Sequence, residues 1–455
     1  MQIIADLQLH SKYSRAVSQK MDLSEIAIWA SKKGLDLMAT GDWQHPLYFR
    51  EITANLREVN PGIYELKNKP FEQVHDVFFL LSTEISSIYT HGGKQRRVHN
   101  LIFSPSISTC EKIIKELQKR GANLMSDGRP IVGLSSKELL DMVLNIDKNV
   151  LFIPAHAWTP WFSIFGSKSG YDSIRECFEE LSSHIYAIET GLSSDPIMNW
   201  QIADLDNRSI VSFSDAHSGP KLGREATVFV STQNAEPITQ NYSYHDIADA
   251  IKQKPENKLK IGYTIEFFPE EGKYHWSGHR TCGIRYNAKE VKEKGTTCPA
   301  CKQSLTIGVE NRVLDLSSRT LHPDDLLFLQ SKTGVTFVYD KEKKRKPFVS
   351  LVPLLEILLE TNNKSQVKAQ REYERLITEL GTEFDILLRK SYEEIEKAGG
   401  ALLRKAVQTV RERKVFVDPG YDGVFGVVKI THETEVKPHE TEATNETTEK
   451  QPTLF

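Results

Sequence analysis

The sequence predicts an α/β fold in which seven short strands form a closed or distorted barrel. Apolar runs alternate with amphipathic stretches from residue 1 to about residue 270, which is typical of parallel β/α structure. Histidines and acidic residues follow most of these runs. A site built from the ends of many strands is how a β/α barrel forms its active face. Together these observations favour a barrel over an open sheet.

The predicted elements of the barrel follow one another in a regular order. Strands are expected at residues 3–5, 35–39, 78–81, 98–102, 151–153, 187–189 and 210–213. Helices are expected at residues 22–33, 109–120, 136–145 and 172–182. Residues 1–270 are therefore predicted to form one catalytic domain.

Two further domains are predicted after the barrel. Residues 271–318 contain three of the five cysteines and are predicted to form a zinc-binding module. Residues 319–430 are predicted to form a helical C-terminal domain, because an apolar stretch at 351–359 precedes a charged amphipathic stretch at 365–413. We expect this domain to end in a strand, a turn and a second strand at 414–430.

The last segment, residues 431–455, is predicted to be disordered. Its first twenty positions contain six Glu and six Thr, so the segment has too little apolar surface to fold. The final five residues resemble the short peptide by which repair and replication proteins hold a sliding clamp, and an incidental C-terminus is the alternative. The candidate clamp-binding residues are Gln451, Leu454 and Phe455.

Composition narrows the class of protein. The chain has 455 residues, enough for two to four domains, and its net charge of −3 does not by itself indicate a nucleic-acid partner. No apolar run approaches the ~20 residues that span a bilayer. The N-terminus enters a predicted strand at once, so we expect no signal peptide. Five cysteines, three of them clustered, do not suggest a disulfide framework. We expect a soluble cytoplasmic enzyme that associates with the nucleoid.

The residues with potential metal chemistry lie in five separated segments. They are Gln8, His10, Asp42, His45, Glu84, His99, His156, Asp215 and His217. Neutral imidazole and carboxylate oxygen bind zinc and similar divalent ions. Asp215 and His217 alternate, so an extended backbone would place both on one face. Glu84 is the candidate bridge between ions, and the candidate catalytic residues are Glu84, His156 and Asp215.

A cluster of divalent ions would give these residues a common function. Water bound to such an ion ionises near pH 7, and ions about 3.5–4 Å apart can hold the attacking and the leaving oxygen of a phosphoester. We therefore predict a metal-dependent hydrolase with two to three divalent ions. Zinc fits the ligands best, and Mg²⁺ and Mn²⁺ are the alternatives. For any single residue of the set, an ordinary buried histidine or a surface acid is the alternative interpretation.

A second metal site is predicted within residues 271–318. His279 and Cys282 form one His-x2-Cys pair, and Cys298 and Cys301 form a Cys-x2-Cys pair fifteen residues further along. This spacing is typical of a structural zinc site with one ion. Four protein ligands would leave no open position for catalysis. His275 is also near, so the identity of the histidine ligand stays open.

Basic and aromatic residues lie close in sequence to the predicted ligands. The candidate phosphate contacts are Lys94, Arg96, Arg97, Lys221 and Arg224. The candidate base contacts are Trp158, Trp161 and Phe162. Such side chains suit binding of a DNA backbone and stacking on an extruded base. Ordinary surface charge and packing of a long loop are the alternatives.

The set of potential ligands resembles the polymerase-and-histidinol-phosphatase (PHP) family, which implies a distorted (β/α)7 barrel with up to three metal ions. That family opens with His-x-His, continues with Asp-His, Glu, His and His, and closes with Asp-x-His. Here His10 matches the second opening histidine, while Gln8 stands in place of the first and His45 is displaced by two positions. Because an amide is a poorer ligand than imidazole, the occupancy of one metal site stays open.

Longer stretches resemble the endonuclease Q family of DNA-repair nucleases. They are residues 6–11, 154–162, 212–218 and 222–226 together with the zinc segment. The resemblance implies hydrolysis of the phosphodiester 5′ of uracil, hypoxanthine, xanthine or an abasic site in double- or single-stranded DNA. We expect metal-activated hydroxide to attack the phosphorus and to leave a 3′-hydroxyl and a 5′-phosphate. The rivals are a small-molecule phosphatase of the histidinol phosphate type and a non-catalytic DNA-binding protein.

Overall fold

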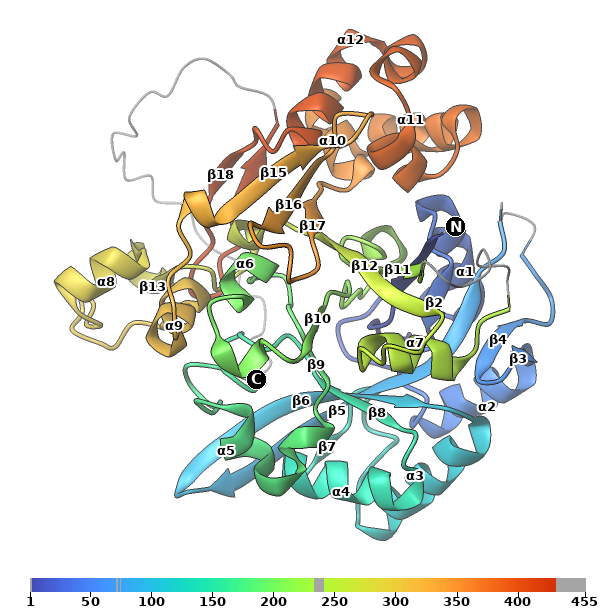
Figure 1. Cartoon of the computed structure of the whole chain (residues 1–455), viewed down its shortest axis with the longest axis vertical. Helices are drawn as coiled ribbons and strands as arrows, with labels where there is room; N and C mark the ends of the chain where they lie inside the picture. Colours follow the sequence, from blue (N-terminus) through green and yellow to red (C-terminus); the bar gives the residue numbers. More distant parts are fainter. Residues whose placement is uncertain (1, 71–72, 74, 233–240, 431–455) are drawn as a thin grey trace, which may run out of the picture.

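The computed structural model shows a mixed α/β fold built around a central sheet (Figure 1). The residues that it describes are 2–70, 73, 75–232 and 241–430. Within them the largest sheet has thirteen strands. Ten form one hydrogen-bonded row in the order β15 (Leu326–Gln330), β16 (Thr336–Asp340), β17 (Phe348–Ser350), β12 (Leu259–Glu266), β11 (Ala226–Ser231), β1 (Gln2–Asp6), β2 (Leu37–Ala39), β5 (Phe78–His91), β4 (Ile63–Leu66) and β3 (Leu56–Asn60). The other three are β6 (Lys94–Ser104) and β7 (Ile131–Val132), which pair with β5, and β8 (Leu151–Pro154), which pairs with β6.

Helices and three small strand pairs surround this sheet. The pairs are β9 (Ala187–Glu189) with β10 (Ser209–Val211), β13 (Ser277–His279) with β14 (Ile284–Tyr286), and β18 (Phe416–Asp418) with β19 (Val427–Lys429). The α-helices are α1 (Leu23–Lys33), α2 (Pro46–Asn55), α3 (Ile107–Lys119), α4 (Ser136–Ile146), α5 (Ile174–Phe178), α6 (Pro196–Asn199), α7 (Tyr244–Ile251), α8 (Ala288–Lys294), α9 (Val309–Leu316), α10 (Leu354–Thr361), α11 (Gln366–Leu380) and α12 (Tyr392–Arg411). Among the described residues, none of the helices combines the length and the apolar character that a membrane crossing requires.

All seven strands predicted for the N-terminal half are present, as β1, β2, β5, β6, β8, β9 and β10. β1, β2 and β5 run parallel to one another, as expected. One face of every one of these strands contributes to the same apolar core, which residues of α7 also enter. The strands contribute Ile3, Ala5, Leu37, Phe78, Leu80, Leu101, Phe103, Leu151, Ile153, Ala187 and Val211. The seven strands therefore face a common interior.

Helix α1 shows how the sequence sets the ends of an element. Asp22 accepts hydrogen bonds from the backbone N–H groups of Ser24 and Glu25, both at 3.1 Å, and so caps the N-terminus. Gly34 ends the helix in the left-handed conformation at φ 89°, which glycine adopts without a steric cost. Because the chain turns at once, β2 begins three residues later, beside β1. The predicted helices at 109–120 and 136–145 are confirmed as α3 and α4, whereas the one at 172–182 is α5 followed by a 3-10 helix over Glu179–His184.

The expectation of an entirely parallel arrangement is wrong at β6, which runs antiparallel to β5. Only Gly92 and Gly93 separate the paired residues His91 and Lys94, which leaves no room for a crossover helix. Both glycines have positive φ, 60° and 72°, as a tight two-residue hairpin turn requires. The sheet is therefore mixed, and the outer parts of β5 and β6, over residues 88–97, form a two-stranded arm.

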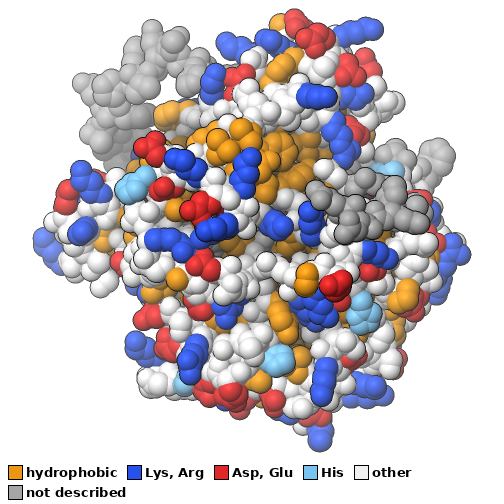
Figure 2. Space-filling model, in the orientation of Figure 1, with side chains coloured by type: hydrophobic (Ala, Val, Ile, Leu, Met, Phe, Trp, Pro, Cys, Tyr) orange, Lys and Arg blue, Asp and Glu red, His pale blue; other side chains and the backbone are white. Residues whose placement is uncertain are grey.

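The prediction of a helical domain over 319–430 is wrong for its first part. β15, β16 and β17 form there and join the central sheet, because β17 pairs in parallel with β12. In β16 buried and half-buried residues alternate, which is a strand pattern too short to stand out in the sequence. β15 is the edge of the sheet, and Phe328 and Leu329 are exposed on it. Figure 2 shows hydrophobic side chains gathered on this side of the molecule, below the helices at the top of the view.

The helical region itself begins at α10 and lies at the top of Figure 1 together with α11 and α12. Arg411, at the end of α12, is only 1 % exposed. Its guanidinium donates hydrogen bonds to the backbone carbonyls of Ile386, Leu387, Lys390 and Thr333. One buried cation thus joins α12 to the π-helix at Asp385–Arg389 and to the turn between β15 and β16. The predicted strand, turn and strand at 414–430 is confirmed as β18 and β19.

A buried ion pair attaches the helical region to the N-terminal half. Lys33 Nζ lies 2.8 Å from a carboxylate oxygen of Glu383, and the two side chains are 1 % and 3 % exposed. The preceding residue in α1, Lys32, makes a second pair with Glu374 at 2.8 Å, but the Glu374 side chain is 43 % exposed. Removing one member of a buried pair leaves an uncompensated charge, whereas a solvated pair contributes little.

Replacement of Lys33 by alanine should lower the free energy of unfolding by about 3–5 kcal/mol, because Glu383 would stay buried without a counter-ion. Lys32→Ala is the matched control and should cost about 1 kcal/mol or less. Urea titration followed by circular dichroism measures both. A loss of equal size in the two variants would contradict the importance of the buried pair.

A group of buried carboxyl groups lies near the ends of β9, β11 and β12. Glu189, Glu225 and Glu266 are each 0 % exposed. Burial raises the pKa of Glu266 to about 8, despite hydrogen bonds from Ser212 and Thr264, and raises the pKa of Glu189 to about 7. For Glu225, burial and the neighbouring Glu266 raise the pKa well above its usual value. Near pH 7 the carboxyl groups of Glu225 and Glu266 are therefore held largely in the neutral form.

Stability should depend on pH through Glu266. Its folded pKa lies above the usual 4.5, so its contribution is complete below about pH 4.5 and is lost as the pH rises through about 8. Glu266→Gln should therefore be more stable than the parent at pH 8 by at least ~1 kcal/mol and similar to it at pH 5. Chemical unfolding at the two pH values measures the difference. Glu293→Gln, at an exposed position on α8, should leave the pH dependence as it is, and an equal change there would count against the assignment.

Candidate metal centre

The predicted ligands come from segments far apart in the chain, each in or just after a strand. Gln8 and His10 follow β1, Asp42 and His45 follow β2, and Asp215 and His217 follow β10. Glu84 lies within β5, His99 within β6, and His156 directly after β8. Two compact groups of potential ligand atoms result, and within each group the atoms lie no more than 4.8 Å apart. The groups are His10, Asp215 and His217, and Glu84, His99 and His156.

Glu84 joins the two groups. One of its oxygens lies 2.5 Å from His99 Nδ1 and 3.6 Å from His156 Nε2. The other oxygen lies 3.3 Å from His10 Nε2, and His10 Nε2 in turn lies 3.3 Å from Asp215 Oδ1. A carboxylate that faces one ligand group with each oxygen has the position that a bridge between two ions requires. The side chain of Glu84 is 1 % exposed, so this contact is shielded from solvent.

The charges of the centre favour cations. Burial opposes ionisation of Glu84, yet His99, Arg129 and hydrogen bonds from His10 and His156 hold its pKa well below the usual value. Burial also opposes ionisation of Asp215, but its hydrogen bond with His10 and the neighbouring His217 lower the pKa overall. Burial lowers the pKa of His99 to about 4, so this imidazole is neutral at pH 7. Burial also lowers the pKa of His217, whereas for His10 and His156 the neighbouring carboxylates outweigh burial and raise the pKa. Carboxylates and imidazoles are the donor set that binds zinc, and a bound ion would take the place of the protons on His10 and His156.

Gln8 fits this donor set through its amide oxygen. Its Nε2 donates a hydrogen bond to Glu84 at 2.9 Å. The buried Oε1 accepts no hydrogen bond from any residue that the structure describes. An unpaired buried acceptor is costly unless a cation or water meets it. The residues present therefore suit a divalent ion at this position too, with an amide oxygen in place of an imidazole.

Asp42 lies behind His10 and not among the closest ligand atoms. One of its oxygens accepts a hydrogen bond from His10 Nδ1 at 3.0 Å. The other accepts from Ser11 N, Ser11 Oγ and Ser14 Oγ at 2.6, 2.7 and 2.9 Å. With both oxygens engaged, Asp42 orients His10 so that Nε2 faces Glu84 and Asp215, which is the usual role of a carboxylate next to a ligating imidazole.

His45 is not brought to either ligand group. Its ring stacks on Tyr13 with 4.5 Å between ring centroids, and its backbone precedes the first turn of α2. The two-position displacement from the PHP pattern therefore has a structural consequence: the prediction of His45 as a ligand is not supported by its location.

Three other site residues have strained backbone, with φ of 44° at Asp42, 28° at His156 and 47° at Asp215. Strain of this kind gathers at functional sites.

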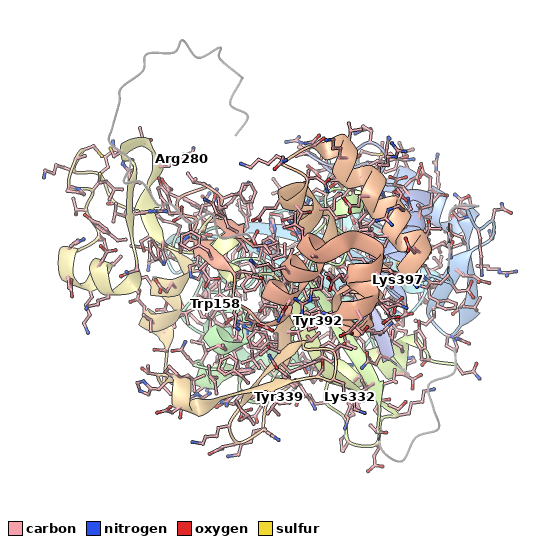
Figure 3. The ribbon with its side chains drawn as sticks, turned by 90° about the horizontal axis from the view of Figure 1, so that it is seen from above. Trp158, Arg280, Lys332, Tyr339, Tyr392 and Lys397 are labelled. Carbon is pink, nitrogen blue, oxygen red and sulfur yellow. The ribbon has the colours of Figure 1, made fainter. Side chains whose placement is uncertain are left out.

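The predicted zinc ligands lie together, and they come from a later part of the sequence than the ligands of this centre. His279, Cys282, Cys298 and Cys301 have ligand atoms within 4.8 Å of one another. Backbone N–H groups of Cys301 and Ala300 help to lower the pKa of Cys298 to about 6, so its thiolate is available near neutral pH. His275, the alternative ligand, is buried elsewhere with Nδ1 3.4 Å from the carbonyl oxygen of Ser193. Arg280, labelled in Figure 3, lies beside this cluster near the edge of the molecule.

Several predicted DNA contacts have structural roles instead. Trp158, labelled in Figure 3, is 1 % exposed and donates a hydrogen bond from Nε1 to Asn199 at 2.8 Å. Arg96 is buried against the ring of Tyr171 and binds the carbonyl oxygen of Gly170. The structure therefore gives no support to the prediction of Trp158 and Arg96 as DNA contacts, because both side chains are used in packing.

Two more basic residues are engaged by the protein itself. Arg224 Nε donates to the carbonyl oxygen of Ser214 at 2.9 Å and so supports the loop that carries Asp215. Lys221 forms an ion pair with Glu356 at 2.6 Å. The structure thus gives Arg224 and Lys221 a role in holding segments together, and their prediction as phosphate contacts gains no support.

Phe162 and Arg97 stay near the centre, and the other predicted contacts are partly or fully exposed. Phe162 packs on His99 with 4.8 Å between ring centroids, and Arg97 lies over the Phe162 ring at 5.5 Å. Trp161 meets Tyr274 of the zinc-ligand region at 5.9 Å. Lys94 is exposed at the start of β6. The predicted clamp-binding residues Gln451, Leu454 and Phe455 lie outside the described residues.

Sequence reasoning missed two residues of the centre. Glu189, at the end of β9, accepts hydrogen bonds from the backbone N–H groups of His156 and Gly191 and so holds the His156 turn. Its position as the last residue of a predicted strand is a usable signal. Arg129 lies 3.4 Å from both Glu84 and His10, and it belongs to a loop with no recognisable motif.

Metal content should separate the two sites. Glu84→Gln removes one of the charged oxygens that face the two ligand groups, so the isolated protein should contain at least one divalent ion fewer per chain and retain any ion held by His279, Cys282, Cys298 and Cys301. Cys301→Ser should show the reverse. Elemental analysis of the purified proteins measures both. Unchanged metal content in Glu84→Gln would contradict the bridging assignment.

Comparisons with known proteins agree with this geometry. No family model matches the chain. The chain is 30 % identical over 332 residues to the uncharacterized protein YqxK of Bacillus subtilis. The aligned stretch covers 70 % of this chain and 78 % of YqxK. It is 28 % identical over 278 residues to the uncharacterized protein MJ0043 of Methanocaldococcus jannaschii, and that stretch spans 60 % of this chain but only 31 % of MJ0043.

Two solved structures resemble nearly the whole chain. One is the lesion-specific endonuclease PfuEndoQ of Pyrococcus furiosus, with a TM-score of 0.76, 28 % identity, and coverage of 95 % of this chain and 96 % of that one. The other is endonuclease Q in complex with a 27-mer duplex that carries an abasic lesion at the active site, with a TM-score of 0.77, 28 % identity, and coverage of 95 % and 98 %. Likeness over the full chain, together with the ligand arrangement, identifies this chain as a member of the endonuclease Q family of nucleases.

Proposed function

We propose that this protein is a metal-dependent DNA-repair endonuclease that hydrolyses the phosphodiester 5′ of a deaminated base or an abasic site. The observation that carries the proposal is Glu84, which faces a separate group of metal-ligating side chains with each oxygen. Full-length likeness to an endonuclease Q that binds an abasic duplex supports DNA as the substrate. Uracil, hypoxanthine and xanthine are the deaminated bases that the family resemblance suggests.

We further propose that residues 1–270 form a distorted (β/α)7 barrel of the PHP type. The seven strands share one interior core. A parallel bridge between Leu9 and Ala216 joins the segment after β1 to the segment after β10, which supports closure of the ring. Residues 271–318 would be the zinc module and residues 319–430 the C-terminal domain, now with β15–β17 at its start.

The side chains that would hold the ions are His10, Glu84, His99, His156, Asp215 and His217, with Gln8 as a further oxygen ligand. Zinc is the first candidate, and Mg²⁺ and Mn²⁺ are alternatives. Divalent ions at this position would lower the pKa of a bound water to about 7 and would neutralise charge on the phosphate. The ion held by His279, Cys282, Cys298 and Cys301 would be structural, because four protein ligands complete its coordination.

The side chains of the protein supply fixed geometry for this reaction. Asp42 and Glu189 hold His10 and the His156 turn in place, so little reorganisation is needed when the substrate binds. In the hydrolysis of the phosphodiester, the oxygen of water bonds to phosphorus and the bond from phosphorus to the 3′ oxygen breaks. The water loses a proton, and the 3′ oxygen receives one. The products are a 3′-hydroxyl upstream and a 5′-phosphate on the damaged nucleotide.

A clamp-binding role for Gln451, Leu454 and Phe455 remains a proposal from sequence alone. A tethered peptide would raise the local concentration of the enzyme on DNA that carries a clamp. The rival activities, phosphatase action on a small phosphomonoester and DNA binding without cleavage, are outcomes of the following experiment.

Asp215→Asn and His156→Ala should each lower the rate of nicking by at least ~100-fold, because each removes a candidate ligand. Binding to the same DNA should change little. Labelled duplexes that carry uracil, hypoxanthine, an abasic site or no lesion measure the rate, and mapping of the cut identifies the bond. Asp172→Asn, at an exposed pair with Arg312, is the control and should cut normally.

Two results would overturn the proposal. Nicking at the normal rate by both variants would place the active site elsewhere. Turnover of a small phosphomonoester with no cut in any damaged DNA would favour the phosphatase.

A further inference from the structure

We propose that Arg129 holds the scissile phosphate beside the metal centre. The inference rests on the proposed nuclease function and assigns a residue to its substrate. Arg129 lies in the loop that connects α3 to β7, far in sequence from the potential ligands of either group. Three features of the structure support the assignment: its contacts, the construction of its loop, and the chemistry of a guanidinium.

The contacts place Arg129 against both ligand groups. Its Nη1 lies 3.4 Å from Oε1 of Glu84 and 3.4 Å from Nε2 of His10. Glu84 Oε1 faces His99 and His156, while His10 belongs to the group with Asp215. The guanidinium therefore lies where the two groups meet. Its side chain is 27 % exposed, so part of it also faces solvent, from which a substrate would approach.

Three hydrogen bonds hold the loop on either side of Arg129. Gly128 N donates to the carbonyl oxygen of Tyr13 at 3.0 Å. Gln44 Nε2 donates to the carbonyl oxygen of Gly128 at 2.5 Å, and Ser86 N donates to that of Pro130 at 3.0 Å. The partners belong to the segments after β1 and β2 and to β5, which also carry His10, Asp42 and Glu84. The loop is thus attached to the same framework as the ligands.

Gly128 is what allows this close approach. A Cβ atom at this position would lie 2.3 Å from Ser14 Oγ and 2.4 Å from Asp42 Oδ2, which is closer than any side chain can tolerate. Asp42 and Ser14 are already engaged around His10. Only glycine can therefore stand directly before Arg129, and the loop has the form of a built part of the centre.

The bonds that Arg129 makes within the protein are weak. Within the described residues its side chain has two close polar contacts, both from Nη1 and both at 3.4 Å, beyond the usual 2.7–2.9 Å of a charge-assisted bond. A guanidinium presents five N–H donors in a plane that matches the oxygens of a phosphate. Most of these donors stay available for a ligand. A phosphodiester is the anion that the proposed reaction brings to this place.

The reaction gives such a contact a purpose. As water bonds to phosphorus and the bond to the 3′ oxygen breaks, charge is spread over the non-bridging oxygens of the phosphate. A fixed cation next to those oxygens stabilises that state. The contact is to the phosphate and not to the base, so the effect of Arg129 should be the same for uracil and for an abasic site.

The test compares Arg129→Ala, Arg129→Gln and Arg129→Lys with the parent and with Arg120→Ala, an exposed arginine just after α3. Single-turnover cleavage should fall by about 100- to 1,000-fold in the alanine and glutamine variants, equally for uracil and abasic duplexes. Lysine should restore part of the rate. Binding of inorganic phosphate to the metal-loaded protein, measured by calorimetry, should weaken at least tenfold, while metal content stays unchanged.

Each other result has a distinct meaning. If Arg129→Ala gains an ion per chain, the guanidinium stands in the place of a metal and the inference is wrong. If an active parent and Arg129→Ala cut and bind phosphate alike, it is wrong as well. If the parent cuts no damaged DNA, the proposed function fails, yet weaker phosphate binding by the variants would still support Arg129. Should alanine prevent folding, the glutamine variant, which keeps most of the side chain, carries the comparison.

Discussion

Glu84 carries a negative charge in the interior of the protein, and much of the surrounding structure serves to balance it. A carboxylate at 2 % exposure is costly unless cations or donors meet it. Strands β1, β6 and β8 lead to His10, His99 and His156, and the loop before β7 brings Arg129. The convergence of strand ends therefore has an electrostatic reason as well as a topological one.

The strands and most ligands could be predicted because they depend on local pattern. A short apolar run followed by histidine or aspartate marks the end of a strand, whatever its partners are. Such a run does not indicate the direction of the strand. The alternation of elements predicts a parallel β6, but the turn at Gly92 and Gly93 makes β6 antiparallel to β5. β15–β17 depend on pairing with β12, a partner that no local signal reveals.

The roles of individual side chains were harder to predict, because they depend on neighbours in space. Trp158 follows His156 closely in sequence, yet it packs inward on Phe165. Asp42 matches a ligand position of the family, but its hydrogen bonds direct it to His10. Arg129 has no motif, since its position depends on a glycine and on three hydrogen bonds between its loop and other segments. Sequence thus indicates which residues gather more readily than what each one does.

The buried pair of Lys33 and Glu383 also bears on how the chain is made. During synthesis, Glu383 is added 350 residues after Lys33. By then β1 and α1 have had a long time to form. Contacts of such large sequence separation form late and slow folding. Until the ribosome has released the C-terminal helices, the N-terminal half has to keep this ammonium group in water, with one side of α1 uncovered. Nascent chains of this protein are therefore expected to need protection from aggregation until the helices around Glu383 have been synthesised.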